Sequence, residues 1–120
     1  MKNKLVALSL LILTCSVAQA YDGISNFMGT GKKTVSNSGT AAQLTTISTP
    51  CQKLVVTALT GNNGYIVVGG STVLASPDAS RVGIPLAAGQ SLPVCVNDVK
   101  NVYIDCTVNG EGVSYIYYYN

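Results

Sequence analysis

Few residues in this sequence have types and spacing suited to catalysis. Glycoside hydrolysis needs two carboxylates that face one bond, and Asp98, Asp105 and Glu111 are the candidates. All three lie in or near expected turns, where acidic side chains are ordinarily just solvated. The 120 residues include no histidine, so neither a Ser-His-Asp nor a Cys-His arrangement can be built. We therefore expect that the protein is not an enzyme.

Cofactors and nucleic acids are not expected either. A zinc ion would have to rely on cysteines that lack the usual motif spacing, and Gly69-Gly70 lies between expected strands instead of before a helix, unlike a phosphate-binding loop. Lys2 and Lys4 account for the net charge of +2, so the rest of the chain is neutral. A nucleic-acid partner would need a basic stripe to displace counterions from phosphates, and none is visible.

The cysteines offer redox chemistry. Cys51, Cys95 and Cys106 would remain after removal of an export signal, which allows one disulfide at most within the chain. Strand alternation places Cys95 and Cys106 on opposite faces, whereas a Cys51–Cys95 bridge is geometrically compatible. The alternatives are three unpaired strand or core residues, or a spare thiol that links subunits.

Tyrosines are concentrated in the last strand expected from the sequence, residues 113–119. Tyr115, Tyr117 and Tyr119 share one face of it, and a tyrosine face binds sugar rings or another protein through a large apolar area tipped with a hydroxyl. Tyrosine is also simply a good strand residue that is often half-buried. We take these three as interface candidates. At a sheet edge, the strand could also pair with another chain.

The elements that must position these residues are short strands separated by turn residues. From residue 41 onward no stretch has a sustained helical period, and the expected strands are 43–47, 53–59, 65–68, 71–74, 84–86, 92–96, 102–108 and 113–119. The glycines and asparagines of 61–64 predict a tight hairpin. About seven or eight antiparallel strands at this spacing predict an all-β fold, a single small β-sandwich or jelly-roll-like domain over 41–120.

Alternation within the expected strands assigns side chains to faces. In 102–108, the set Val102, Ile104, Cys106 and Val108 should point into the core, and the set Tyr103, Asp105 and Thr107 should point outward. In 92–96 the valines and Leu92 should point inward, which leaves Cys95 on the outer face.

The residues before 41 differ in character. Lys2 and Lys4, an apolar run over 5–13 and Ala18-Gln19-Ala20 are typical of a cleavable signal peptide at 1–20. The apolar run is much shorter than the roughly 20 residues that span a bilayer as a helix. We expect export to the periplasm, the cell surface or the medium, with no stable membrane span. Lipid attachment at Cys15 is an alternative, although Thr14 is a poor residue before a lipidated cysteine.

Residues 21–40 are rich in glycine and serine and predict a flexible arm. Its two larger apolar residues, Phe27 and Met28, would pack on the domain or on a neighbouring subunit.

Five segments between residues 43 and 120 resemble small β-rich virion structural proteins of tailed bacteriophages, of the capsid-decoration or fibre type. They are TPCQKLVV (49–56), GYIVVGGS (64–71), GIPLAAGQS (83–91), NDVKNVYI (97–104) and GEGVSY (110–115). The resemblance implies a β-rich structural domain without enzymatic activity. The export signal departs from the family, whose members assemble in the host cytoplasm.

Two functions are therefore expected as alternatives. The first is an exported structural protein that makes repeated protein–protein contacts, with itself or with other subunits, in a virion or surface fibre. The second is a monomeric exported module that blocks a host surface receptor, so that its partner is a component of the host envelope, or that binds surface glycans. Oligomeric state distinguishes them.

Overall fold

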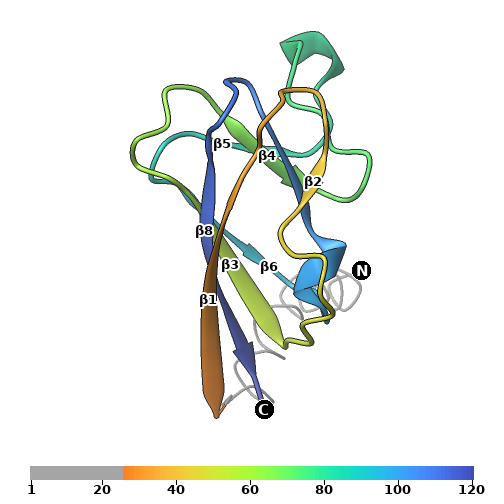
Figure 1. Ribbon diagram of the computed structural model, residues 1–120, viewed down its shortest axis with the longest axis vertical. Helices are drawn as coiled ribbons and strands as arrows, with labels where there is room; N and C mark the ends of the chain where they lie inside the picture. The colour runs from red at the N-terminus through yellow and green to blue at the C-terminus, as the bar shows by residue number, and fades with distance from the viewer. Residues whose placement is uncertain (1–25) are drawn as a thin grey trace, which may run out of the picture.

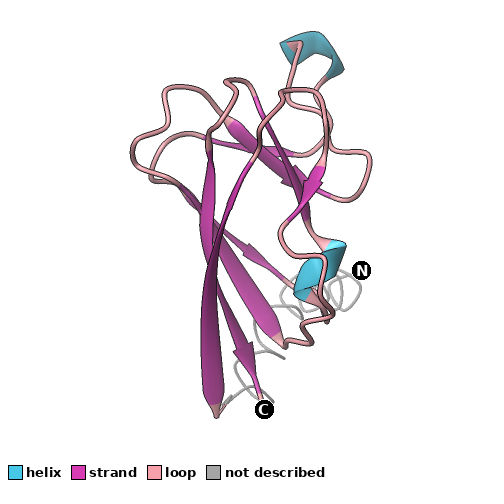
Figure 2. Cartoon of the chain, viewed as in Figure 1, coloured by secondary structure: helices cyan, strands magenta, loops and turns pink. Residues whose placement is uncertain are grey.

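The computed structural model describes residues 26–120, and the predicted signal peptide at 1–20 lies outside them. Figure 2 shows strands joined by loops, with two helical turns. The strands are β1 (Phe27–Thr34), β2 (Ala42–Gln43), β3 (Lys53–Ala58), β4 (Ile66–Gly69), β5 (Ile84–Leu86), β6 (Ser91–Val94), β7 (Tyr103–Cys106) and β8 (Gly112–Tyr119). The turns are the 3-10 helices η1 (Asp78–Ser80) and η2 (Val99–Asn101). The predicted all-β class is confirmed.

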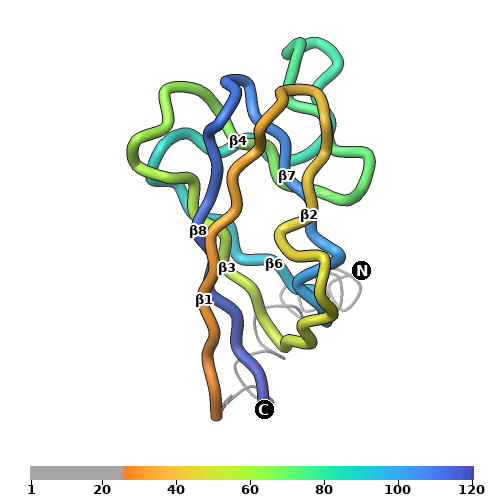
Figure 3. Tube along the Cα trace, in the orientation of Figure 1, coloured from red at the N-terminus to blue at the C-terminus, as the bar shows by residue number. Residues whose placement is uncertain are grey.

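The strands form two four-stranded sheets, in the orders β1-β8-β3-β6 and β2-β7-β4-β5. Every pairing is antiparallel. Of the consecutive strands, only β4 and β5 pair with each other, and every other connection between consecutive strands crosses from one sheet to the other. In Figure 1 and Figure 3, β1 and β8 run side by side along their whole length.

The core lies between the two sheets. β3 supplies Leu54, Val56 and Ala58 from alternate positions, and all three are fully buried. They meet buried residues of the second sheet, among them Ile66 and Ile104. A fully buried Leu or Ile side chain contributes about 1.5–3 kcal/mol, so this alternation accounts for much of the cohesion between the sheets.

The prediction of a flexible arm over 21–40 is wrong for residues 27–34, which form β1. This strand pairs with β8 from Phe27 opposite Tyr119 to Thr34 opposite Gly112, and Val35 after it is buried. The domain therefore includes β1 and does not begin at residue 41. Residues 21–25 of the predicted arm lie outside the described part of the chain.

Three local predictions are also wrong. The 61–64 turn joins β3 to β4, which lie in different sheets, so it is not a hairpin. Of the expected strand 43–47, only Gln43 lies in a strand. It belongs to β2, which pairs with β7. The expected strand 71–74 contributes a single bridge at Leu74.

The predicted faces of 102–108 hold in part. Val102, Ile104 and Cys106 are buried in the core as expected. Val108 is 41% exposed, because β7 ends at Cys106 and the alternation ends with it. Asp105 lies on the outer face as expected, but it is fully buried there because loops cover it.

Candidate interaction surface

The three candidate tyrosines form a ladder along one face of β8. The ring centroids of Tyr115 and Tyr117 are 6.3 Å apart, and those of Tyr117 and Tyr119 are 5.7 Å apart. The ladder continues onto β1, where the Phe27 ring stacks on Tyr119 at 5.5 Å. The structure thus brings the predicted set together and adds Phe27, which the sequence placed in the arm.

Most of this ladder belongs to the inner face of its sheet. Tyr115 and Tyr117 share alternation with the buried Val113 and pack against the core. The Tyr115 hydroxyl lies 3.5 Å from the Leu44 carbonyl oxygen, to which it donates. Burial, and after it the neighbouring Tyr117, raises the pKa of Tyr115, which favours the protonated donor. Only Tyr119, at 37%, counts as exposed, so the accessible surface is the far end of the ladder.

Two glycines of β1 make room for the ladder. Gly29 lies opposite Tyr117, and Gly31 lies opposite Tyr115. A Cβ atom on either glycine would overlap the facing tyrosine ring. The rings therefore extend sideways over the backbone of β1 and supply the apolar contact that the glycines lack.

Beyond the ladder, the start of β1 presents two large apolar side chains to solvent. Phe27 is 56% exposed and Met28 is 58% exposed, on opposite faces of the strand. Phe27 does pack on its own domain through Tyr119, as expected, but keeps more than half of its surface open. The other exposed large apolar residues are Ile47, Tyr65, Val82, Ile84 and Val108.

The three acids considered for catalysis each hold a different loop. Glu111 accepts from the backbone N–H of Asn63 and from that of Gly64, the latter at 2.8 Å. The side chain of Asn62 donates to the Gly112 carbonyl at 2.8 Å. The 61–64 turn is thus fastened to the turn before β8.

Asp98 caps helix η2 and ties it to the loop before β3. Its Oδ1 accepts from the backbone N–H groups of Thr49 and Lys100 at 2.9 and 3.0 Å. Its Oδ2 accepts from the Ser48 hydroxyl at 2.8 Å. These donors, the Thr49 N–H first, lower the pKa of Asp98, so it is ionised at neutral pH.

Asp105 holds two loops over the outer face of the second sheet. Its Oδ2 accepts from the Ala75 N–H at 2.7 Å, and its Oδ1 accepts from the N–H groups of Gly39 and Cys106 at 2.9 Å each. The Ala75 loop covers the carboxylate, together with a small apolar cluster of Val67, Val73 and Ala75. No local sequence signal indicates this cover, which is why Asp105 was expected to be exposed.

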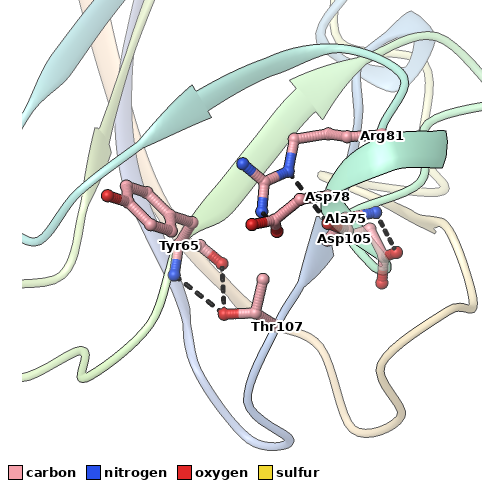
Figure 4. A network of polar contacts seen from close by, with 6 residues as sticks. All are labelled: Tyr65, Ala75, Asp78, Arg81, Asp105 and Thr107. Atoms are coloured by element: carbon pink, nitrogen blue, oxygen red, sulfur yellow. Dashed lines mark hydrogen bonds and ion pairs between the residues drawn. The ribbon is translucent and has the colours of Figure 1, made fainter.

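Arg81 anchors the excursion between β4 and β5 (Figure 4). Its Nε donates to the Ala75 carbonyl at 2.9 Å, and its Nη2 lies 2.5 Å from Asp78 Oδ1. The guanidinium carbon lies 5.3 Å from the centroid of the Tyr65 ring, a cation–π distance. The Tyr65 N–H in turn donates to the Thr107 hydroxyl at 2.9 Å. These contacts fix the loop against the second sheet.

The possible Cys51–Cys95 bridge is not formed, because Cys51 is a free thiol. Cys51 and Cys106 are free, buried thiols, and Cys51 Sγ donates to the Val96 carbonyl at 3.2 Å. Cys95 is on the outer face and exposed, as alternation predicted. Burial raises the pKa of both Cys51 and Cys106, so both are protonated and poorly reactive at neutral pH.

An apolar groove of about 460 Å³ runs between β6 and the β4–β5 pair, at the margin where the two sheets separate. Its lining includes Ile84, Leu92, Pro93 and Val96. Sequence reasoning missed it, because the groove depends on how two sheets meet.

Within residues 26–120, no three potential metal-binding side chains lie together. In the same range, neither helix is long and apolar enough to cross a membrane.

No family model matches the sequence, and the searches of curated proteins and of solved structures gave no significant match.

Proposed function

We propose that this chain is an exported structural protein, a jelly-roll subunit that makes repeated protein–protein contacts in a virion or surface fibre. The observation that carries the proposal is the order in which the strands pair. β1 pairs with β8, β2 with β7, β3 with β6 and β4 with β5. A ribbon of paired strands rolled into two sheets is the connectivity of a jelly roll, an architecture used by viral capsid and lectin domains.

A fold alone does not define a function, and the surface adds support. At the end of the β1–β8 pair, Phe27 and Tyr119 expose large apolar side chains on one face and Met28 exposes one on the other. Such side chains are enriched at protein–protein interfaces. The three buried carboxylates support the same conclusion, because each accepts hydrogen bonds from backbone N–H groups, as structural carboxylates do.

The test is the oligomeric state of the protein secreted from its full-length gene. Light scattering after size-exclusion chromatography, over a range of concentrations, should reveal a defined oligomer, and electron microscopy should show whether it extends into fibres. Cys51 and Cys106 should not link copies covalently, since both are free thiols buried in the domain. A monomer at every concentration would overturn the proposal and favour the receptor-blocking module.

A further inference from the structure

Four strands lie at the edges of the two sheets, and three of them are short. β2 has two residues, β5 has three with Pro85 at its centre, and β6 has four with Pro93. Short length, proline and charged side chains, lysine in particular, are means by which proteins prevent edge strands from pairing with other chains.

β1 is neither short nor interrupted by proline, and its two lysines, Lys32 and Lys33, lie near one end only. It has eight residues, contains no proline, and keeps an unbroken register with β8 from end to end. Within residues 26–120, β8 is its only strand neighbour. Its other side is therefore a long row of backbone donors and acceptors, flanked by exposed side chains, at the margin of the sheet (Figure 1).

The sequence of β1 is complementary to itself in the antiparallel direction. Exposed apolar residues, Phe27 and Met28, lie at one end, and Lys32 and Lys33 lie near the other. A parallel pair would place each lysine against its own copy. An antiparallel pair centred on Thr30 places Lys33 opposite Phe27 and Lys32 opposite Met28. An ammonium group beside an aromatic ring is attractive, whereas opposed like charges are destabilising.

We propose that β1 is the contact between two copies of this chain, which pair antiparallel about a two-fold axis at Thr30. The β1-β8-β3-β6 sheet of one copy would then join the same sheet of the other copy into one eight-stranded sheet. This inference rests on the proposed structural function and specifies one protein–protein contact of the proposed assembly. A two-fold contact closes on itself, so the dimer is the unit from which a larger assembly would be built through other surfaces.

The first test places a charge at the two-fold axis. Thr30 is exposed, so Thr30→Lys should leave the domain folded while opposing two lysines in the dimer. We expect about a tenfold rise in the dimer dissociation constant, measured by analytical ultracentrifugation of the full-length secreted protein. Thr34→Lys is the matched control. Thr34 is also exposed and on the same face of β1 but lies away from the axis, so the constant should be unchanged.

The second test is disulfide trapping. At the axis, the Cβ atoms of two opposed residues lie about 4.5–5.5 Å apart, so Thr30→Cys should cross-link two copies under mild oxidation. The two copies of residue 34 would lie about 27 Å apart at 3.4 Å per residue, so Thr34→Cys should not.

The outcomes distinguish this inference from the proposed function. Cross-linking at position 30 but not at 34, together with dissociation of Thr30→Lys, supports the β1 contact. An oligomer that survives Thr30→Lys, without cross-linking at position 30, overturns the contact but keeps the structural function. A wild-type protein that stays monomeric overturns both.

Discussion

The Tyr117 ring lies across the backbone of Gly29, its partner on the neighbouring strand, so closely that a Cβ atom there would overlap Cζ and the hydroxyl. Gly31 and Tyr115 repeat the relationship two residues along. Large rings from a central strand thus cover an edge strand that has no side chain at these positions.

Gly29→Ala should therefore destabilise the domain by about 1–3 kcal/mol, the usual effect of forcing extra volume into a packed site. The free energy of unfolding from urea titration measures it. Gly70→Ala is the control, because nothing lies within 4 Å of a Cβ atom there. Equal stability of the two variants would show that the Tyr117 ring moves aside at no cost.

This packing explains why β1 was not predicted. The inner-face positions of β1 include Gly29 and Gly31, and the apolar volume that alternation normally places there comes instead from tyrosines more than eighty residues later. By contrast, β3 and β8 carry their own alternating apolar residues, and both were found. Apolar alternation and strand propensity thus identify strands that bury their own side chains. They do not identify a strand such as β1, whose inner face is covered by side chains of its neighbour.

The candidate surface was predictable to a similar extent. Alternation placed Tyr115, Tyr117 and Tyr119 on one face correctly, but the choice between inner and outer face depends on where the second sheet ends. The one indication in the sequence is Val113, an apolar residue that shares their alternation. In the structure Val113 is fully buried. The burial of Asp105 has no such signal, because the loop that covers it begins beyond β4.

Asp98 should make stability depend on pH. Its pKa is lower in the folded state than in the unfolded chain, so its contribution is fully present above about pH 4, the unfolded value, and is lost as the pH falls through the folded pKa. Asp98→Asn should be less stable than wild type at pH 7, and the difference should shrink below about pH 4. Asp78→Asn should show little of either effect, because the Asp78 side chain is 88% exposed. A constant difference for Asp98→Asn from pH 7 to pH 3 would contradict this expectation.

Asp105→Ala should be the most damaging substitution of an acid. It would leave the N–H groups of Ala75 and Cys106 without their acceptor in a buried site, and that of Gly39 without its acceptor at the margin of this site. Each buried donor left unpaired costs about 1–3 kcal/mol, so the two buried donors predict a loss of about 2 kcal/mol or more. Asp105→Asn retains one acceptor oxygen and should lose less. Hydrogen exchange should quicken at Ala75 and Gly39 in particular, and unchanged exchange there would rule out the loop-anchoring role.

The thiols of Cys51 and Cys106 should resist alkylation in the native protein. Both are buried with raised pKa values, so at pH 8 few are thiolates and none is accessible. A short pulse of N-ethylmaleimide followed by peptide mapping should modify neither residue in buffer and both in denaturant. Rapid native modification of Cys51 would mean that the loop before β3 opens readily.

The tyrosine ladder should separate into a structural part and a surface part. Tyr117 packs against the core and over Gly29, so Tyr117→Ser should cost about 3 kcal/mol or more of unfolding free energy, in the range of large-to-small core changes. Tyr119 is 37% exposed and contacts mainly the ring of Phe27 and that of Tyr117, so Tyr119→Ser should cost about 1 kcal/mol, the scale of one aromatic pair. In the assembled protein the order should reverse. Tyr119→Ser should weaken association while the fold remains, because its ring supports Phe27 at the start of β1. If Tyr119→Ser assembles like wild type, the end of the ladder is not part of the contact.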